Sequence, residues 1–255
     1  MPLKIVSPLS NDVYERVDIL GQGLYSTVYQ VLCDGQKYAA KFICMGSLNK
    51  DEQNLTQREQ QFVQYILQQP ADSFNFVIQY KETFQFNDAK EKSNVVCIVM
   101  EVGLGSLAQY MDIVGELSLQ NIKTVFDQMV VAIYGLHQQG ILHRDIKPDN
   151  IMIVDDTDGN LVARLIDFGF CRDGPGQTMV GTSDYVHPKI ARGEQHSFEV
   201  DIWSLGASLL EMLTYVADVN KQSDEYQLMQ QISKQMMQEQ NQMSLQEYIK
   251  VYINQ

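Results

Sequence analysis

The pattern of apolar residues changes near Gly103, and this change constrains the fold more than any other feature. Before it, short segments carry alternating or β-branched apolar residues between glycine-bearing turns, which predicts strands at 14–20, 26–32 and 37–43. After it, apolar residues recur every three or four positions from Ile122 to Leu136, which predicts a helix. We therefore expect an α+β fold with a β-rich N-lobe at 14–102, a mainly helical C-lobe at 103–255, and residues 1–13 as an N-terminal extension.

The same patterns predict further elements. A helix is expected at 55–67, where apolar residues share one face, and Pro70 closes it. Two strands are expected at 77–83 and 95–100, with a solvated hairpin loop between them. Residues 200–213 are apolar nearly all round, which predicts a helix buried in the core. The tail from Asn220, rich in Gln and Met, fits either an amphipathic helix or a poorly ordered extension.

Charge and cysteine usage narrow the functional classes. The formal net charge of −13 argues against a sequence-independent grip on nucleic acid and against docking on an anionic membrane. The four cysteines form no CxxC pair and none lies beside histidine at metal-ligand spacing, so neither a zinc site nor a disulfide framework is expected. No segment is long and apolar enough to cross a bilayer, and the first residues lack the apolar run of a secretory signal. We predict a cytoplasmic or nuclear protein and leave its oligomeric state open.

A glycine-rich stretch, GQGLYSTV, lies at 21–28 between two predicted strands. Gly21 and Gly23 would let the backbone approach a polyphosphate without an intervening side chain. In a dinucleotide-binding fold a helix would follow the glycines at once. Here the β-rich sequence STVYQVL follows, so the dinucleotide interpretation is rejected.

Five motifs together resemble those of the protein kinase family in order and spacing: GQGLYSTV, YAAK, HRDIKPDN, DFG and DIWSLG. The resemblance is to the serine/threonine-specific type and covers roughly residues 14–215. It implies a two-lobed kinase fold, ATP and Mg²⁺ as cofactors, and protein substrates with Ser or Thr acceptors. Weaker similarities point to two subfamilies: YVHP is similar to the IκB-kinase-related kinases, and VYQVL to the monopolar-spindle kinases.

The resemblance assigns catalytic roles residue by residue. Lys41 would neutralise the α- and β-phosphates, and Glu59 would position it through an ion pair, with Glu52 as the competing partner. Asp145 would accept the proton of the substrate hydroxyl. Lys147 would contact the transferring γ-phosphate, and lysine at this position is typical of the serine/threonine-specific type.

The resemblance also assigns cofactor contacts. Asn150 and Asp167 would supply the hard oxygen ligands that Mg²⁺ prefers. Met100 would line the back of the adenine pocket, while Glu101 C=O and Gly103 N–H would bond the base edge. Three apolar side chains would pack on the faces of the base: Val28, Ala39 and Met152. The linker EVGLGSL is one residue shorter than the usual family linker, and this departure affects the assignment of the base-edge contact to Gly103.

Regulatory and supporting roles follow by the same comparison. Arg144 beside Asp145 implies control by an activation-loop phosphate, and Thr178 is the expected phosphorylation site. Thr182 is expected to hydrogen-bond near the catalytic loop. Asp201 is expected to brace the backbone of that loop.

Several positions depart from the family pattern. Ser26 replaces the third glycine of the loop, and His187-Pro188-Lys189 stands where the family has Ala-Pro-Glu. No arginine follows Arg192, so the usual partner of that glutamate is missing as well. The C-lobe is short after residue 213, which leaves open a reduced lobe or a shortened chain. Two alternatives to a serine/threonine kinase therefore remain: a kinase-fold binding module, and a kinase of dual specificity.

Overall fold

The computed structural model describes residues 2–23, 26–70, 73–88, 93–155, 161–174, 181–238 and 245–249. The chain divides into two compact units. Unit 1 comprises residues 1–71 and 78–103, and unit 2 comprises residues 72–77 and 104–255. Within the described residues, no helix combines the length and the apolar character needed to cross a membrane.

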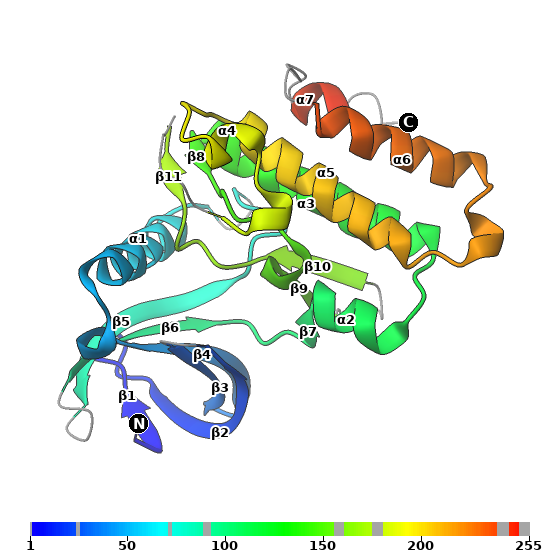
Figure 1. Ribbon diagram of the computed structural model, residues 1–255. Coiled ribbons are helices and arrows are strands. Elements are labelled where there is room, and N and C mark those ends of the chain that lie inside the picture. The colour runs from blue at the N-terminus through cyan, green and yellow to red at the C-terminus, as the bar shows by residue number, and fades with distance from the viewer. Residues whose placement is uncertain are drawn as a thin grey trace. The chain divides into compact units, whose positions relative to one another are not determined.

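Unit 1 is built on one antiparallel sheet with the strand order β1-β2-β3-β4-β6-β5 (Figure 1). Its strands are β1 Lys4–Val6, β2 Val13–Gln22, β3 Ser26–Cys33, β4 Gln36–Cys44, β5 Tyr80–Asp88 and β6 Ser93–Met100. The three predicted strands before residue 44 are confirmed as β2, β3 and β4. Asp34 and Gly35 have positive φ angles of 50° and 79°, which is the backbone that a tight two-residue hairpin requires.

The strand predicted at 77–83 was placed three residues too early. Phe76 has a φ of +60°, and Val77 forms an isolated bridge to Leu165 within unit 2. A bulky residue with positive φ interrupts an extended segment, and nothing in the local pattern announces it. The strand therefore begins at Tyr80. The predicted hairpin loop is shorter than expected, because β5 runs to Asp88 and β6 starts at Ser93.

Helix α1, Lys50–Leu67, confirms the predicted helix and begins five residues earlier. The Asn49 side chain caps it by accepting bonds from the first-turn amides, and the Glu52 carboxylate accepts a bond from the Asn49 N–H. Buried Val63 packs with Ile43, Val96 and Ile98 beside a short 3₁₀ turn, Met45–Ser47. Burial of each such side chain contributes about 1.5–3 kcal/mol, so packing on the sheet holds α1 in place.

Residues 1–13, expected to precede the domain, contribute a strand to the sheet. Ile5 lies opposite Tyr14 in the β1–β2 pairing, and both side chains are buried. They belong to an apolar cluster that includes Val31, Phe42 and Phe84. The first strand is therefore part of the packed structure of unit 1.

Unit 2 is mainly helical. Its helices are α2 Leu107–Val114, α3 Leu119–Gln138, α4 Pro188–Ala191, α5 Glu199–Thr214, α6 Asp224–Met236 and α7 Leu245–Tyr248. Its strands are β7 Gly105–Ser106, β8 Ile141–Leu142, β9 Ile151–Asp155, β10 Leu161–Leu165 and β11 Arg172–Asp173. Among the residues of unit 2 that the structure describes there are also three 3₁₀ turns: Pro148–Asn150, Ser183–Tyr185 and Asp218–Asn220.

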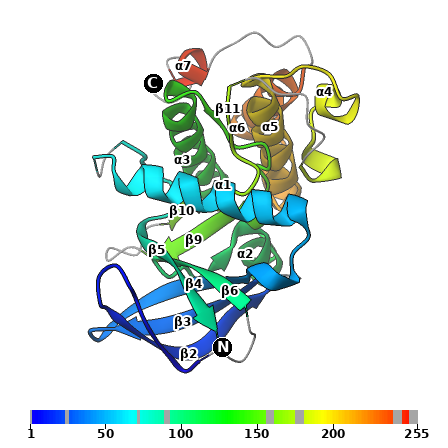
Figure 2. The same cartoon turned by 90° about the vertical axis from the view of Figure 1, so that its left-hand side faces the viewer.

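The core of unit 2 is formed by α3, α5 and α6, which run beside one another (Figures 1 and 2). The predicted helices at 122–136 and 200–213 are confirmed as α3 and α5. Gly206 allows α6 to approach closely, since a Cβ there would lie 2.7 Å from the Cβ of Met236. Ser233 Oγ donates to the Gly206 carbonyl at 2.9 Å and fixes this contact.

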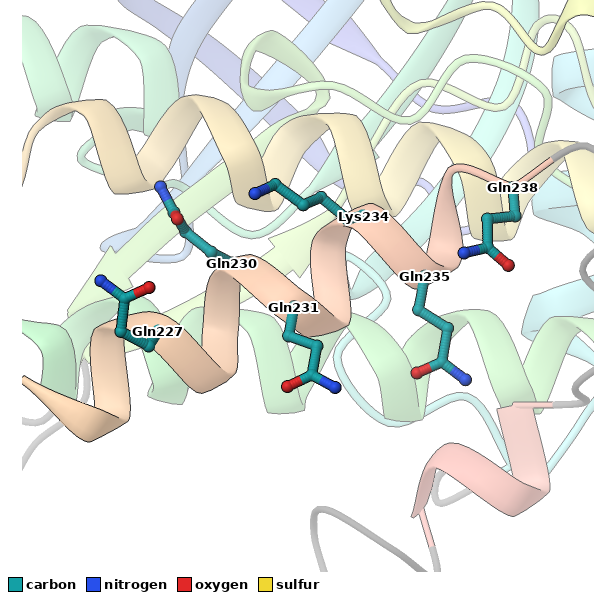
Figure 3. Close-up of a pocket in the computed structure, with 6 residues that line it drawn as sticks. All are labelled: Gln227, Gln230, Gln231, Lys234, Gln235 and Gln238. Atoms are coloured by element: carbon teal, nitrogen blue, oxygen red, sulfur yellow. The ribbon is translucent and has the colours of Figure 1, made fainter.

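The part of the tail at 224–236 folds as an amphipathic helix, α6. Tyr226, Met229, Ile232 and Met236 are buried, and the mean spacing of three to four residues places them on one face. The other side carries a row of long polar side chains, shown in Figure 3: Gln227, Gln230, Gln231, Lys234, Gln235 and, just after the helix, Gln238. Because glutamine favours both helices and polar unstructured segments, composition alone left this region open.

Candidate active site

The segment His143–Asp145, which follows β8, is held by the buried carboxylate of Asp201 on α5. Asp201 accepts hydrogen bonds from His143 N at 2.9 Å and Arg144 N at 2.7 Å. Arg144 has a φ of +70°, an uncommon conformation for a residue with a side chain. The two bonds to Asp201 stabilise this strained backbone. The bracing role expected of Asp201 is thus confirmed.

His137, at the end of α3, is a third donor to Asp201 that the sequence analysis missed. Its Nε2 lies 2.8 Å from Asp201 Oδ2, and its ring packs on Phe198 with centroids 4.5 Å apart. Burial alone would raise the pKa of Asp201, but the hydrogen bond and charge of His137 lower it below the ordinary carboxyl value. The carboxylate therefore stays ionised inside the core. The available signal was a histidine in the last turn of the amphipathic helix α3, four positions after buried Ile133.

Asp145 lies in a polar cluster with Lys147, Asn150 and Thr182. Thr182 Oγ1 donates to Asp145 Oδ1 at 2.9 Å, and Lys147 Nζ lies 3.1 Å from Asp145 Oδ2. Lys147 also donates to Thr182 Oγ1 at 2.5 Å. The Thr182 contact expected from the sequence is confirmed. The cluster fixes a carboxylate and an ammonium next to each other, with the carboxyl group 93% shielded from solvent.

The side chain of Asn150 is oriented by Asp145. Its amide nitrogen donates to the main-chain oxygen and to Oδ2 of Asp145, both at 2.8 Å. Both N–H bonds are thereby used, which leaves Oδ1 as the atom that can ligate a cation. The Ile166 amide donates to the Asn150 carbonyl at 2.9 Å, so Asp167 follows directly after this contact. Two hard oxygen donors on neighbouring segments of unit 2 fit the preference of Mg²⁺.

The segment around Asp167 is anchored by its neighbours. Phe168 is fully buried, and its ring packs edge-on against His143 with centroids 4.9 Å apart. Asp167 itself has a φ of +63° and accepts a bond from Gly169 N at 3.3 Å. Burial of the phenyl ring fixes the backbone on either side. The Asp167 carboxylate is therefore presented on a defined turn.

Arg144 has its guanidinium buried, and its Nε donates to the Phe170 carbonyl at 2.8 Å. This contact joins the His143–Asp145 segment to the residues that follow Gly169. Thr178, its predicted regulatory partner, lies outside the residues that the structure describes. The regulatory pairing stays a prediction.

Unit 1 presents the ion pair that the sequence predicted. Lys41 Nζ on β4 donates to both carboxylate oxygens of Glu59 on α1, at 2.7 and 2.9 Å. The side chains are 18% and 7% exposed, so water screens the pair only in part. Glu52, the competing partner, is used instead in the N-terminal cap of α1. Its position three residues after Asn49 was a capping signal available in the sequence.

The residues predicted to line the nucleotide site belong to unit 1, where they lie on its strands or directly after them, with one exception. Gly21 lies opposite Val28, and Val28 lies opposite Lys41, in the pairing of β2, β3 and β4. Gly23 N donates to Ser26 O at 2.8 Å, which closes the glycine turn.

The other predicted contacts to the base lie near the end of unit 1. Ala39 is opposite Met100 in the pairing of β4 and β6. Glu101 follows β6 and exchanges bonds with the backbone of Gln79, both at 2.8 Å, and Gly103 ends the unit. The exception is Met152, which lies on β9 in unit 2.

Lys189, which stands where the family has the glutamate of Ala-Pro-Glu, forms a different ion pair. Lys189 Nζ lies 2.9 Å from Glu199 Oε1, ten positions along the chain. Burial alone would raise the pKa of Glu199, but bonds from Lys189 and from the Ser197 amide lower it below its ordinary value. A local ion pair, with the cation at position 189 and the carboxylate at position 199, is therefore present in this segment.

Comparison with known proteins agrees with the geometry. The protein kinase domain matches residues 14–253. The chain is 29% identical over 219 residues to the protein kinase C zeta type of Oryctolagus cuniculus, covering 83% of this chain and 35% of that protein. It is 30% identical over 221 residues to the serine/threonine-protein kinase AtPK1/AtPK6 of Arabidopsis thaliana, covering 83% and 44%. It is 31% identical over 216 residues to protein kinase 2 of Dictyostelium discoideum, covering 80% and 41%. The chain spans less than half the length of these relatives, and it belongs to the protein kinase family.

Proposed function

We propose that this chain is a serine/threonine protein kinase that transfers the γ-phosphate of ATP to Ser or Thr hydroxyls of proteins. The observation that carries the proposal is the cluster of Asp145, Lys147, Asn150 and Thr182. It combines an oriented carboxylate, an adjacent cation and an amide oxygen for a metal. Phosphoryl transfer requires these three features and little covalent chemistry from the protein.

Asp145 is the proposed proton acceptor. Its two oxygens are held by Thr182 and Asn150, which sets the direction from which a substrate hydroxyl can approach. A positioned base of this kind contributes roughly 10²–10⁴-fold to the rate. Lys147, already 3.1 Å from this carboxylate, is the proposed contact to the transferring phosphoryl group. Its charge would compensate the negative charge that collects on the phosphoryl oxygens.

Asn150 and Asp167 are the residues proposed to hold Mg²⁺. When bound, the ion supplies charge neutralisation at the phosphate oxygens. Lys41 is the proposed cation for the α- and β-phosphates, and Glu59 orients it. The glycines at 21 and 23 are proposed to cover the phosphates. The adenine contacts remain predictions at these positions: Val28, Ala39, Met100, Glu101, Gly103 and Met152.

The preference for Ser and Thr over Tyr is supported by two observations. Lysine at position 147 resembles the serine/threonine-specific type. The relative in Arabidopsis thaliana, with 30% identity, is described as a serine/threonine-protein kinase. Phosphoamino-acid analysis of the products tests the preference, and phosphotyrosine at a comparable level would show dual specificity instead.

A radiolabel transfer assay tests the catalytic proposal. The purified chain is incubated with labelled ATP, Mg²⁺ and a mixture of Ser/Thr peptides, beside Asp145→Asn and Asp149→Asn. Asp149 is a matched control because it lies in the same loop and is exposed. We expect transfer by the parent and by Asp149→Asn, and a loss of at least about 100-fold in Asp145→Asn. Equal background signal from all three proteins would favour the kinase-fold binding module.

A further inference from the structure

A buried carboxylate in unit 1, outside the set of residues assigned to catalysis or nucleotide binding, gathers three hydroxyl groups. Glu82 on β5 is 9% exposed. Its Oε1 accepts bonds from Tyr14 Oη at 2.5 Å and Ser10 Oγ at 2.9 Å, and its Oε2 accepts one from Ser7 Oγ at 2.7 Å. We call these four residues the Glu82 cluster. It joins the first fourteen residues of the chain to the opposite edge strand of the sheet.

The loop that carries Ser7 and Ser10 is ordered by its own backbone and by the Glu82 cluster. Ser7 N donates to Asp12 O at 2.9 Å, and Asn11 N donates to Ser7 O at 3.1 Å. Asn11 closes the loop with a φ of +64°. Ser7 Oγ also accepts from the amides of Leu9 and Ser10. This loop connects β1 directly to β2, so its position determines whether β1 can pair.

The three hydroxyl residues differ in their accessibility. Ser7 and Tyr14 are fully buried, and burial raises the pKa of Tyr14, which therefore remains a protonated donor. Ser10 is exposed, although its hydroxyl reaches the buried carboxylate. A modifying enzyme can therefore approach Ser10 while the other two hydroxyls are shielded.

The charges around Ser10 are unfavourable for an added anion. Its hydroxyl contacts Glu82 and accepts a bond from the Asp12 amide at 3.2 Å. The nearby cation, Lys81, is engaged by Asp12 with 3.0 Å between charged atoms, and its ammonium also lies over the Tyr38 ring. The Lys81 ammonium is thus engaged by Asp12, while the contacts described for the Glu82 carboxylate come from hydroxyl groups. A phosphate adds about 1.5–2 negative charges, which disrupts a contact to a carboxylate by repulsion.

We propose that Ser10 is a phosphorylation site and that a phosphate there detaches β1 from the sheet. A protein kinase would transfer the γ-phosphoryl group of ATP to Ser10 Oγ. The new P–O bond forms as the bond between the β,γ-bridging oxygen and the γ-phosphorus breaks, ADP leaves, and the hydroxyl proton passes to that kinase's base. The phosphate then repels Glu82, the loop at 7–12 opens, and β2 becomes the edge strand. Gly21 lies near the end of β2, so the strand that becomes the edge is the one that carries this glycine.

Hydrogen exchange measured by mass spectrometry tests the repulsion without relying on the proposed activity. Phosphoserine is placed at position 10 of the full chain by expanded-code translation. We expect the amides of β1 to exchange at least about tenfold faster than in the unmodified chain. In a Glu82→Gln background, phosphoserine should accelerate them less than about threefold, because the charge it opposes is gone. Protected amides of α1 verify that each variant is folded.

Two matched results would overturn the proposal. Ser10→Ala removes the hydrogen bond without adding charge, so it should change β1 exchange by less than phosphoserine does; an equal effect would assign the change to the lost bond. Unchanged or slower exchange with phosphoserine would show that the segment tolerates or captures the phosphate. Finally, phosphopeptide mapping of the chain isolated from its own growing cells should find modified Ser10, and a peptide that is entirely unmodified would reject the site.

Discussion

Replacement of Asp201 by asparagine should destabilise unit 2 far more than the small change in shape suggests. The carboxylate has no exposed surface and accepts three hydrogen bonds, from His137, His143 and Arg144. An asparagine side chain offers one acceptor oxygen and one donor nitrogen. The asparagine oxygen could take the place of Oδ2 and keep the bonds from His137 and His143. Its nitrogen would then take the place of Oδ1 and face the Arg144 N–H, so that two hydrogen-bond donors oppose each other.

The magnitude follows from these contacts. A buried amide left without an acceptor costs about 1–3 kcal/mol, and exchanging two charge-assisted bonds for neutral ones costs about 1 kcal/mol each. The free energy of unfolding should therefore fall by about 3–5 kcal/mol. The positive φ of Arg144 adds to the effect, because a strained backbone without its hydrogen bond relaxes to another conformation.

Urea unfolding followed by circular dichroism measures the difference. The matched control is Asp127→Asn, which removes the carboxylate of a partly exposed ion pair between Asp127 and Lys123, both on α3. That change should cost less than about 1 kcal/mol. If both variants unfold within about 1 kcal/mol of each other, the reasoning from buried acceptors is refuted.

Three further changes test other contacts. Glu59→Gln should lower kcat/KM roughly 10–100-fold in the peptide assay by loosening Lys41; parental kinetics would remove the ion pair from the mechanism. Thr182→Ala should lower kcat while Thr182→Ser restores it, because the hydroxyl bridges the carboxylate and ammonium of the catalytic loop; equal rates in both would contradict this. The pKa of Glu199 is lowered in the folded state, so its pair with Lys189 stabilises the fold at pH values above 4.5, the ordinary pKa of this carboxyl group. This stabilisation is lost as the pH falls through the lowered pKa of the folded state. Lys189→Met should therefore lower the urea midpoint of unfolding at pH 7 but change it little in acid. A difference between variant and parent that stays constant across the pH range would contradict this prediction.

The elements predicted best were those whose apolar pattern extends over many residues. The helix α3 and the strands β3 and β4 repeat their apolar pattern several times, so the period identifies them, and α5 is identified by its long, nearly continuous apolar run. The strands β7, β8 and β11 have two residues each and therefore no period to detect. Their pairing depends on distant segments. The start of β5 depends on the backbone of Phe76, which propensity does not show.

The same distinction applies to the polar sites. The cluster around Asp145 and Asn150 comes largely from one short motif, so local sequence predicted its members. Glu82 receives bonds from residues 68 to 75 positions away, and no local pattern links such residues. His137 was missed for a similar reason, since its partner Asp201 lies 64 positions later. Contacts of this kind, between residues far apart in the sequence, can be identified only from the folded backbone.

The segment between Thr182 and α5 shows how a motif departure is accommodated. Its ion pair between Lys189 and Glu199 is partly exposed, at 33% and 22%, and so contributes at most about 1 kcal/mol. Buried contacts attach the segment more firmly. The Ser204 hydroxyl donates to the Tyr185 carbonyl at 2.7 Å, and His187, fully enclosed, accepts a bond from the Lys189 amide.

These contacts join neutral groups and so depend little on salt, whereas the ion pair is screened by it. A segment held mainly by the ion pair would loosen in high salt. One held by hydrogen bonds to α5 and by the packing of the His187 ring against Trp203 keeps its position. The reversed charge order at Lys189 therefore changes a minor contribution to stability, and the attachment of this segment to α5 rests on contacts that the departure leaves intact.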